Sequence, residues 1–263
     1  HPVRTVILII LTMLQVLSVF TGLMMIRSMQ QELSLAEARL GADLLVYPTQ
    51  AMSKISKSGL LMQGTPVAVY KPRSMLSRLN DCEGINAISY QIYLKDNTGK
   101  DRDIWIVGFD TETDFVIRPW LAEGTDFEIP DGSLIIGSKL DAAPDNTIRL
   151  FQETWPVSGH LLETGSELDQ MIFVSMATLS ELLQTSAAAG VDSYTGLDPQ
   201  NTFSAALIRT DNKNNIESVT NWINIHVRKV NAIRSEAVLT SAANIAANAR
   251  EAAPNGIISF IAV

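Results

Sequence analysis

The chain of 263 residues is long enough for one large domain or two small ones. Its formal net charge is −8, and lysine and arginine do not cluster anywhere along it, which argues against nucleic acid as a partner because phosphate binding needs clustered cations. Cys82 is the single cysteine, so neither an internal disulfide nor a thiolate metal cluster can form.

The first element predicted along the chain is a membrane-spanning helix. Residues 6–26 carry no charge, and Arg4 and Arg27 flank them. A helix of this length rises about 30 Å, which is the thickness of the hydrocarbon layer. An Ala-x-Ala pair at residues 36–38 lies about ten residues too far downstream to serve as a signal-peptide cleavage site. We therefore expect residues 1–27 to form an uncleaved transmembrane anchor, with a buried helix of a soluble domain as the alternative.

One face of this predicted helix is suited to packing against another helix. Gln15, Ser18 and Gly22 fall within about 60° of one another on a helical wheel. Ser18 and Gly22 form a small-xxx-small pair, which lets a second backbone approach closely. The three residues are candidates for contact with helices outside this chain; the alternative is that a lone anchor tolerates them by chance.

An amphipathic pattern continues beyond the membrane segment. Apolar side chains recur every three or four residues from Ile26 to Leu40, and Gly41 follows as a stop signal. Residues 28–41 are therefore predicted to form a helical stalk that would transmit movement between membrane and domain. The acidic balance of the residues that follow favours a cytoplasmic N-terminus and a domain outside the cytoplasm.

Residues 42–256 are predicted to form an extracytoplasmic α+β domain, which can be divided into two lobes, with residues 103–200 the more strand-rich. Two of its strands should form a hairpin around a turn at Asp96–Gly99. Strands are predicted at Asp43–Tyr47, Ile85–Leu94, Ile104–Phe109, Leu134–Ile136, Thr147–Phe151, Trp155–Leu162 and Phe203–Arg209. Helices are predicted at Arg73–Leu79, Ala177–Leu183, Ile216–Val230 and Ser241–Ala252.

The last residues, 257–263, are uncharged and strongly apolar. Seven residues are too few to span a bilayer, yet they follow a predicted helix. We expect the start of a truncated second transmembrane helix here, and a hydrophobic strand is the alternative.

The chemistry-bearing side chains do not form a recognisable catalytic or metal site. Asp110, Glu112 and Asp114 alternate like the start of a calcium loop, but the glycine and distal glutamate of such a loop are absent, which favours a solvated turn. His160 and His226 have no second ligand at metal-binding spacing. No phosphate-binding G-x-x-x-x-G-K-[ST] loop occurs. We predict no cofactor, no metal and no catalytic residue.

The order of segments resembles the FtsX-like/MacB-type permeases of ABC transporters. Leu40–Pro48 (LGADLLVYP) is similar to the family's passage from the first helix to the external domain, and Ile106–Asp110 is similar to its V-x-G-x-D strand. Trp155–Ser175 resembles the family's V-x-G-x-L-x-x-T-G-x-x-x-D-x-x-x-F stretch. The residues that mark the resemblance are Gly41, Asp43, Pro48, Gly108, Gly159, Thr164, Gly165 and Asp169.

This resemblance implies a permease subunit in the cell (inner) membrane. Its partners would be a cytoplasmic ABC ATPase that hydrolyses ATP, a second permease copy or paralogue, and membrane lipid. The external domain would then serve export, extraction or mechanical signalling without catalysis of its own. The family usually has three further transmembrane helices and a cytoplasmic coupling segment, which this sequence does not contain, so ATPase docking is not located in it. The alternative is a single-pass anchored binding or sensor domain; an anchored enzyme has the least support.

Overall fold

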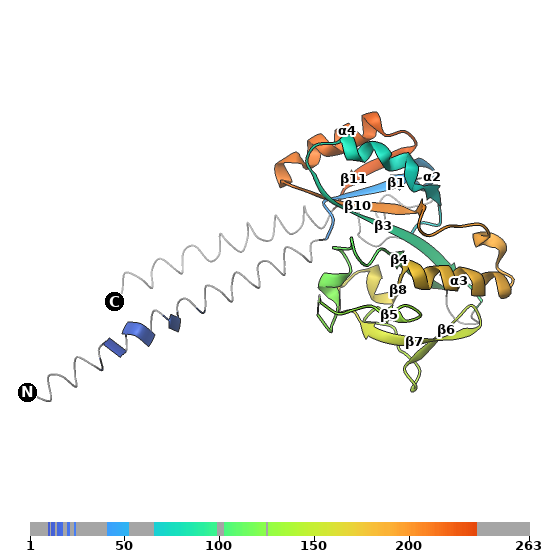
Figure 1. Ribbon diagram of the computed structural model, residues 1–263, viewed down its shortest axis with the longest axis horizontal. Coiled ribbons are helices and arrows are strands. Elements are labelled where there is room, and N and C mark those ends of the chain that lie inside the picture. The colour runs from blue at the N-terminus through green and yellow to red at the C-terminus, as the bar shows by residue number, and fades with distance from the viewer. Residues whose placement is uncertain are drawn as a thin grey trace, which may run out of the picture. The chain divides into compact units, whose positions relative to one another are not determined.

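The structure is a computed structural model that describes residues 41–52, 66–98, 103–124 and 126–235, together with single residues between Ile10 and Met24 (Figure 1). The chain divides into two compact units, His1–Arg39 and Leu40–Val263. The predicted helix Ser241–Ala252 and the predicted membrane segment 257–263 lie outside the described residues.

In the first unit the described residues are helical and their side chains are exposed. The Thr21 hydroxyl donates to the Leu17 carbonyl one turn earlier, at 2.8 Å. Among the described residues, no helix combines the length and the apolar character needed to cross a bilayer. The predicted anchor and stalk consist mainly of residues outside the described set, so both stay predictions.

The second unit is built on a mixed sheet. Within the described residues, nine strands hydrogen-bond in the order β11-β1-β10-β3-β4-β8-β5-β7-β6. The pairs β4–β8 and β5–β7 are parallel, and the other neighbours are antiparallel. The strands are β1 (Leu44–Pro48), β3 (Ile85–Asp96), β4 (Ile104–Phe109), β5 (Leu134–Ile136), β6 (Thr147–Leu150), β7 (Glu153–His160), β8 (Met171–Ser175), β10 (Ala205–Thr210) and β11 (Val230–Arg234). A separate two-stranded sheet pairs β2 (Lys71–Pro72) with β9 (Thr202–Phe203).

Strand β3 connects the two halves of the main sheet. One half contains β11, β1 and β10, and the other contains β4, β8, β5, β7 and β6. The first part of β3 pairs with β10, from Ile85 opposite Thr210 to Gln91 opposite Ala205. Its second part pairs with β4, from Gln91 opposite Phe109 to Asp96 opposite Ile104, which confirms the predicted hairpin. Strand β3 therefore belongs to both halves of the sheet, and its side chains alternate between the two faces along its whole length.

Helices cover one face of each half. Helix α4 (Ile216–His226) lies beside β11, and α3 (Met176–Ala188) lies against β4 and β8 (Figure 1). The Ser175 hydroxyl begins α3 by accepting a hydrogen bond from the Thr178 amide, as an N-cap does. The remaining helical segments are α2 (Thr49–Met52) and the 3₁₀ helices η2 (Arg73–Asp81), η3 (Arg118–Trp120), η4 (Glu167–Gln170), η5 (Asp192–Tyr194) and η6 (Lys213–Asn215).

The buried apolar side chains form three clusters. One, the common cluster, lies on a single face of the sheet and includes Leu45, Leu207 and Phe173, so it spans both halves. On the opposite face the core is divided. An α3 cluster contains Ile106 and Leu179, and an α4 cluster contains Leu44, Ile208, Leu79 and Ile223. The two predicted lobes thus share one sheet and one face of the core.

The fold class, α+β, is confirmed, and several elements differ from the prediction. Strands β2, β8 and β11 were not predicted, and α3 runs five residues beyond the predicted end at Leu183. The predicted helix Ile216–Val230 is wrong beyond His226, because β11 begins at Val230 and pairs with β1. Residues Arg73–Asp81 form a 3₁₀ helix. The single strand predicted at Phe203–Arg209 is interrupted at Ser204, whose amide bonds to Gln91.

Candidate functional site

The chain enters and leaves the described domain at one point. Gly41 has a φ of +70°, a left-handed conformation that suits glycine, and β1 begins three residues later. The Asp43 amide donates to Ile208 at 2.9 Å, and its carbonyl accepts from the Ser235 amide at 2.9 Å. Strand β1 thus lies between the strand that precedes the exit and β10.

The Asp43 carboxylate makes this junction specific. It is buried and accepts hydrogen bonds from the Thr210 amide at 2.8 Å and from the Thr210 hydroxyl at 2.9 Å. A buried carboxylate needs such donors because burial without them is costly. One side chain therefore ties the start of β1 to the end of β10.

Pro48 marks the opposite end of β1. It is buried and pairs with Val230 at the start of β11. Proline has no amide hydrogen to donate, and the next amide, of Thr49, donates to the Lys229 carbonyl at 2.9 Å. Leu44, at the other end, pairs with Arg234, so the two ends of β1 define the two ends of this part of the sheet.

Gly108 in β4 allows α3 to approach the sheet. A β-carbon at this position would lie 2.3 Å from Cδ2 of Leu179, a contact that real β-carbons do not make. Leu179 is fully buried in the α3 cluster. The V-x-G-x-D element is therefore a packing element, and Asp110 at its end accepts a hydrogen bond from the Glu112 amide at 3.1 Å.

The T-G-x-x-x-D residues form a closed loop before β8. Asp169 Oδ1 accepts from the Thr164 amide at 2.8 Å and from the Thr164 hydroxyl at 2.7 Å, and its Oδ2 accepts from the Gly165 amide at 3.0 Å. Gly165 has a φ of +70°. The Thr164 hydroxyl also lies 2.7 Å from that of Ser166, which accepts a hydrogen bond from the Leu168 amide. The structure thus brings these three predicted residues together as one loop.

Two residues that sequence reasoning missed complete this loop. Lys139 places its Nζ 3.2 Å from Oδ2 of Asp169, whose side chain is fully buried. Burial alone would raise the pKa of Asp169, but hydrogen bonds from Thr164, Lys139 and Ser138 lower it to about 2. At Gly137 a β-carbon would lie 2.4 Å from the Leu168 carbonyl oxygen, so only glycine lets the chain after β5 pass the loop.

Gly159 in β7 permits a different close approach. A β-carbon there would lie 3.2 Å from Oε2 of Glu123 and 3.4 Å from Cε1 of Phe127. The same glutamate oxygen accepts a weak hydrogen bond from the His160 amide at 3.4 Å. A side chain at this position would be tight against the flexible end of Glu123, so Gly159 is a less strict packing position than Gly108.

Of the helix-packing candidates, the structure describes only Gln15, which is helical and exposed. Ser18 and Gly22 lie outside the described residues, so the role of the three stays a prediction.

The alternating acidic residues form a turn that is only partly solvated. Glu112 is exposed, but Asp114 is buried and accepts hydrogen bonds from the amides of Val116, Ile117 and Arg118 at 2.9–3.3 Å. Burial raises the pKa of Asp114 against the opposing effect of these bonds. The prediction of a solvated turn is thus wrong for Asp114, which organises η3.

The two remaining candidates for metal binding lie apart. His160 ends β7, and His226 ends α4, where its ring stacks on Trp222 at 4.6 Å between centroids. Across the described segments, no group of three His, Cys, Asp or Glu side chains is placed to hold a metal ion.

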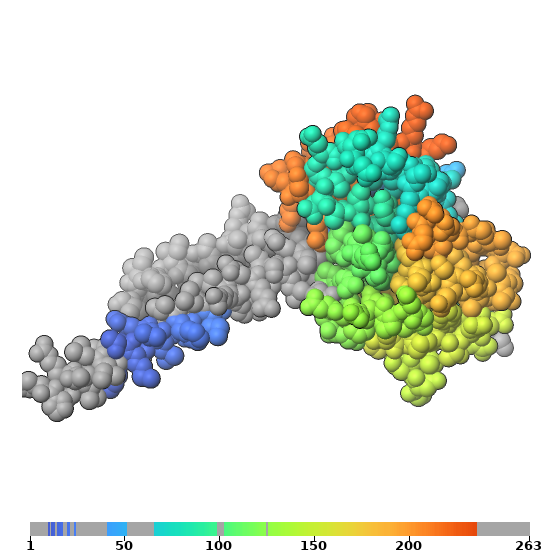
Figure 2. All heavy atoms as spheres, in the orientation of Figure 1, coloured from blue at the N-terminus to red at the C-terminus, as the bar shows by residue number. Residues whose placement is uncertain are grey.

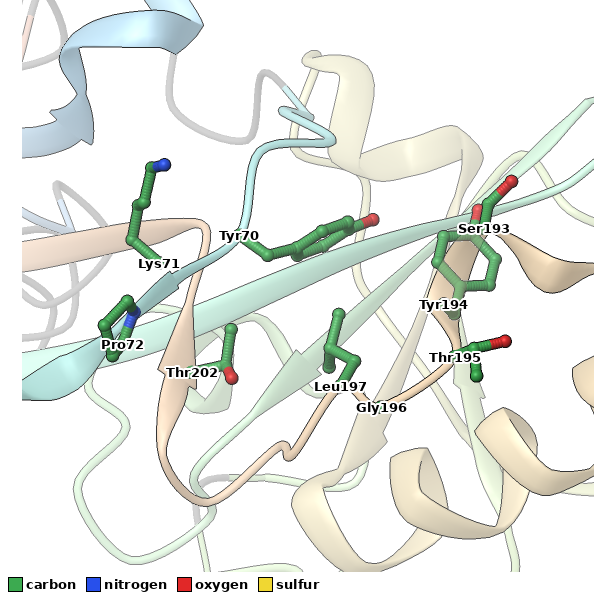
Figure 3. A pocket seen from close by; sticks show the side chains of 9 residues that line it. All are labelled: Tyr70, Lys71, Pro72, Ser193, Tyr194, Thr195, Gly196, Leu197 and Thr202. Carbon is green, nitrogen blue, oxygen red and sulfur yellow. The ribbon is translucent and has the colours of Figure 1, made fainter.

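One cavity lies where β3 and β10 separate. It has a volume of about 290 Å³, and Tyr70, Tyr194 and Leu197 line it together with the β2–β9 pair (Figure 3). The Tyr70 hydroxyl donates to the Tyr93 carbonyl at 2.7 Å, and the Tyr194 hydroxyl bonds to the amide and the carbonyl of Lys95 at 2.9 and 2.8 Å. The two hydroxyls thereby form hydrogen bonds with backbone groups of β3 that lie beyond its pairing with β10.

The sequence matches no protein-family model and no curated protein. Among solved structures, the fold is similar to the periplasmic region of MacB from Actinobacillus actinomycetemcomitans, with a TM-score of 0.43 and 8% identity over 76% of this chain and 92% of that chain. It is also similar to the extracellular domain of the noncanonic ABC-type transporter YknZ from Gram-positive bacteria, with a TM-score of 0.38 and 12% identity over 73% of this chain and 99% of that chain. Both are similarities of fold between chains of very different sequence.

Proposed function

We propose that the chain is part of a permease subunit of an FtsX-like/MacB-type ABC transporter. In this proposal residues 1–27 cross the cell membrane with the N-terminus in the cytoplasm, residues 28–41 form the stalk, and the domain works outside the cytoplasm. A separate ABC ATPase hydrolyses ATP, and a second permease copy or paralogue completes the transporter.

The observation that carries the proposal is the position of the two chain connections. The Asp43 carbonyl accepts a hydrogen bond from the Ser235 amide at 2.9 Å, and Leu44 pairs with Arg234. A domain inserted between two membrane helices needs both connections at the same end, whereas a domain on a single anchor needs only one. The resemblance of Leu40–Pro48 to the family's passage from helix to domain supports the same proposal.

The junction also suggests how movement would reach the domain. A displacement of the stalk acts on β1, and β1 is hydrogen-bonded on one side to β11 and on the other to β10. The Asp43–Thr210 bonds hold the ends of β1 and β10 together. The three strands would therefore move together, and a movement of the membrane segments would move the domain. We call this coupling the lever.

The test uses the full-length subunit purified from its source in a mild detergent. We expect an ABC ATPase to co-purify and ATP turnover to be measurable. Replacing Leu33 and Ser34 by glycine costs about 1 kcal/mol per residue relative to a good helix former and places a flexible break in the stalk. This variant should keep ATP turnover and lose the export or signalling output.

The matched control places alanine at both positions, which preserves helix propensity and should preserve the output. A full-length protein that recruits no ATPase would contradict the proposal and favour the anchored binding or sensor domain. An output that survives the glycine pair would contradict the lever while leaving the permease assignment intact.

A further inference from the structure

A groove of about 540 Å³ lies between η2 and the turn that joins α4 to β11. In Figure 2 the teal atoms of η2 and the red-orange atoms that follow α4 lie next to one another at the top of the domain. The lining residues are Met75, Ser77, Arg78, His226, Val227, Arg228 and Lys229. Three of these side chains are permanently positive and none is acidic, on a chain whose net charge is −8.

Two hydrogen bonds connect the walls of the groove to the rest of the domain. Arg78 Nη1 donates to the His226 carbonyl at 3.0 Å, which ties η2 to the end of α4. Lys229 has a φ of +62°, and its carbonyl accepts from the Thr49 amide at 2.9 Å, which ties the turn to the end of β1. A partner would therefore meet a preformed surface, and preformed surfaces lose less entropy on binding.

Cations at the C-terminal end of a helix are common because they stabilise its free carbonyls. That explanation accounts for Arg78, which donates to His226. Arg228 and Lys229 also follow the helix, and both side chains are exposed. Across the described residues, neither side chain has an ion-pair or hydrogen-bond partner. The Ile223 carbonyl near them is already bonded to the Val227 amide at 2.9 Å.

The surroundings of the groove are apolar as well as basic. Met75 is half-buried in its lining, and Ile225, the neighbour of His226 in the last turn of α4, is 75% exposed. Val230 pairs with Pro48, so the groove lies at the end of β1 opposite to Asp43, where the chain enters. If the connections lead to the membrane, as proposed above, this end faces away from lipid.

We propose that this groove docks an acidic amphipathic segment of a partner protein. Carboxylates of the segment would contact Arg78, Arg228 and Lys229, and its apolar side chains would cover Met75 and Ile225. Charge complementarity selects the acidic partner, and the exposed apolar side chain distinguishes such a segment from a free anion. Only the exclusion of lipid rests on the proposed function.

The test measures fluorescence anisotropy of a short fluorescein-labelled peptide that alternates glutamate and leucine, with the full chain in a zwitterionic detergent. Reversal of both exposed charges, Arg228→Glu with Lys229→Glu, should weaken binding by about five-fold or more, because each exposed pair contributes up to about five-fold. Added salt should weaken binding to the unmodified chain more than to this variant. Ile225→Ser should weaken binding by about two-fold or more without changing the salt dependence.

The control is Lys213→Glu, a charge reversal on an exposed side chain just before α4, and it is compared with Lys229→Glu alone, which makes the same charge change in the groove. Lys213→Glu should leave binding unchanged, and circular dichroism should show all variants folded. Equal weakening by Lys213→Glu would overturn the proposal, because net charge alone would then control binding. A second contrary outcome is that an all-glutamate peptide, inorganic phosphate or phosphatidylglycerol vesicles bind as tightly as the alternating peptide and lose this binding in the same double variant. That result would overturn the proposal and identify an anion or a lipid headgroup as the ligand of the groove. ATPase recruitment is measured separately, so failure here is distinct from failure of the permease proposal.

Discussion

Single residues show how the domain stabilises a charged side chain in its interior. Asp169 is buried, yet donors surround its carboxylate and hold its pKa at about 2. Thr164 and Gly165, which supply three of these bonds, are neighbours in sequence and belong to the same stretch, Trp155–Ser175, that carries the family resemblance. Lys139 was not predicted, because it lies on a distant segment and no spacing rule connects the two.

We expect Asp169→Asn to lower the free energy of unfolding by about 2 kcal/mol at neutral pH, because a carboxylamide loses charge-assisted acceptance from Thr164 and Lys139. The folded-state pKa of about 2 lies below the ordinary value of 3.8. The contribution of this carboxylate is therefore fully present above about pH 4 and is lost as the pH falls towards 2. Urea unfolding of both proteins across this range measures it.

Glu163→Gln is the matched control. Glu163 also contacts Lys139, at 3.6 Å, but its side chain is 72% exposed. The control should change the free energy of unfolding by less than about 0.5 kcal/mol. A difference between Asp169→Asn and the unmodified chain that stayed constant down to pH 2 would contradict the assigned pKa.

Gly108 provides a second test at this scale. Gly108→Ala should destabilise the domain by about 1–3 kcal/mol, because the added methyl group meets Leu179 in a packed core. The double variant Gly108→Ala with Leu179→Ala should be less unstable than the sum of the two single variants, as a double-mutant cycle would show. Additive losses would mean that the two side chains do not compete for the same space.

Among the elements, the local pattern predicts several strands closely even where their neighbours in the sheet are distant in sequence. Strands β4 and β5 begin and end where the sequence indicates, and β3 begins where predicted and runs two residues further. Strand β8, whose five residues are all buried, was missed, although β1, which is equally buried, was predicted. The 3.6-residue period runs on to Val230, so sequence reasoning extended α4 by four residues. The structure ends α4 at His226 because the following chain pairs with β1, a distant contact that overrides local periodicity.

The hairpin β6–β7 contains a strained turn that sequence reasoning did not identify. Leu150 pairs with Glu153, and the two residues between them, Phe151 and Gln152, have φ values of +47° and +69°. Two positive φ angles are the pattern of a type I′ turn, which normally selects asparagine and glycine. Phe151 is held there by burial and by the bond from its amide to Oδ2 of Asp96 at 2.9 Å.

Gln152→Gly should therefore raise the free energy of unfolding by about 0.5–1 kcal/mol. Glycine adopts a positive φ without the clash that other residues suffer, and Gln152 is exposed, so no packing is lost. Thr154→Gly, in the adjoining strand, should have the opposite sign because glycine weakens a strand. Thermal unfolding of both variants measures the two signs, and a loss at Gln152 would show that the turn is not strained.

At the scale of the whole described domain, one sheet and one shared cluster join the two halves. Leu207 belongs to the common cluster, and Leu182 belongs to the α3 cluster on the other face. Strand β3 is hydrogen-bonded to both halves, so unfolding of one half would expose an edge of β3 and part of the shared cluster to water. The structure therefore favours cooperative unfolding in place of two independent lobes.

Calorimetry should show a single transition for the domain. Leu207→Ala and Leu182→Ala should each lower its midpoint, since such core truncations cost about 2–5 kcal/mol. Leu162→Ala is the matched control, because that side chain is 41% exposed and its truncation should have little effect. Two transitions, each shifted by only one of the core variants, would contradict this view.

The hydrogen bond between Asp43 and Ser235 has a consequence for how such a domain can be exchanged between proteins during evolution. Neighbouring strands lie about 5 Å apart, so the two connections of the domain begin at almost the same place. A two-residue turn can join chain ends at that separation. The domain could thus be removed from its host chain and the gap closed by a tight turn, or exchanged for another domain with the same spacing, without displacing what lies on either side. A module of this kind can change its own surface while the rest of the host protein stays unchanged.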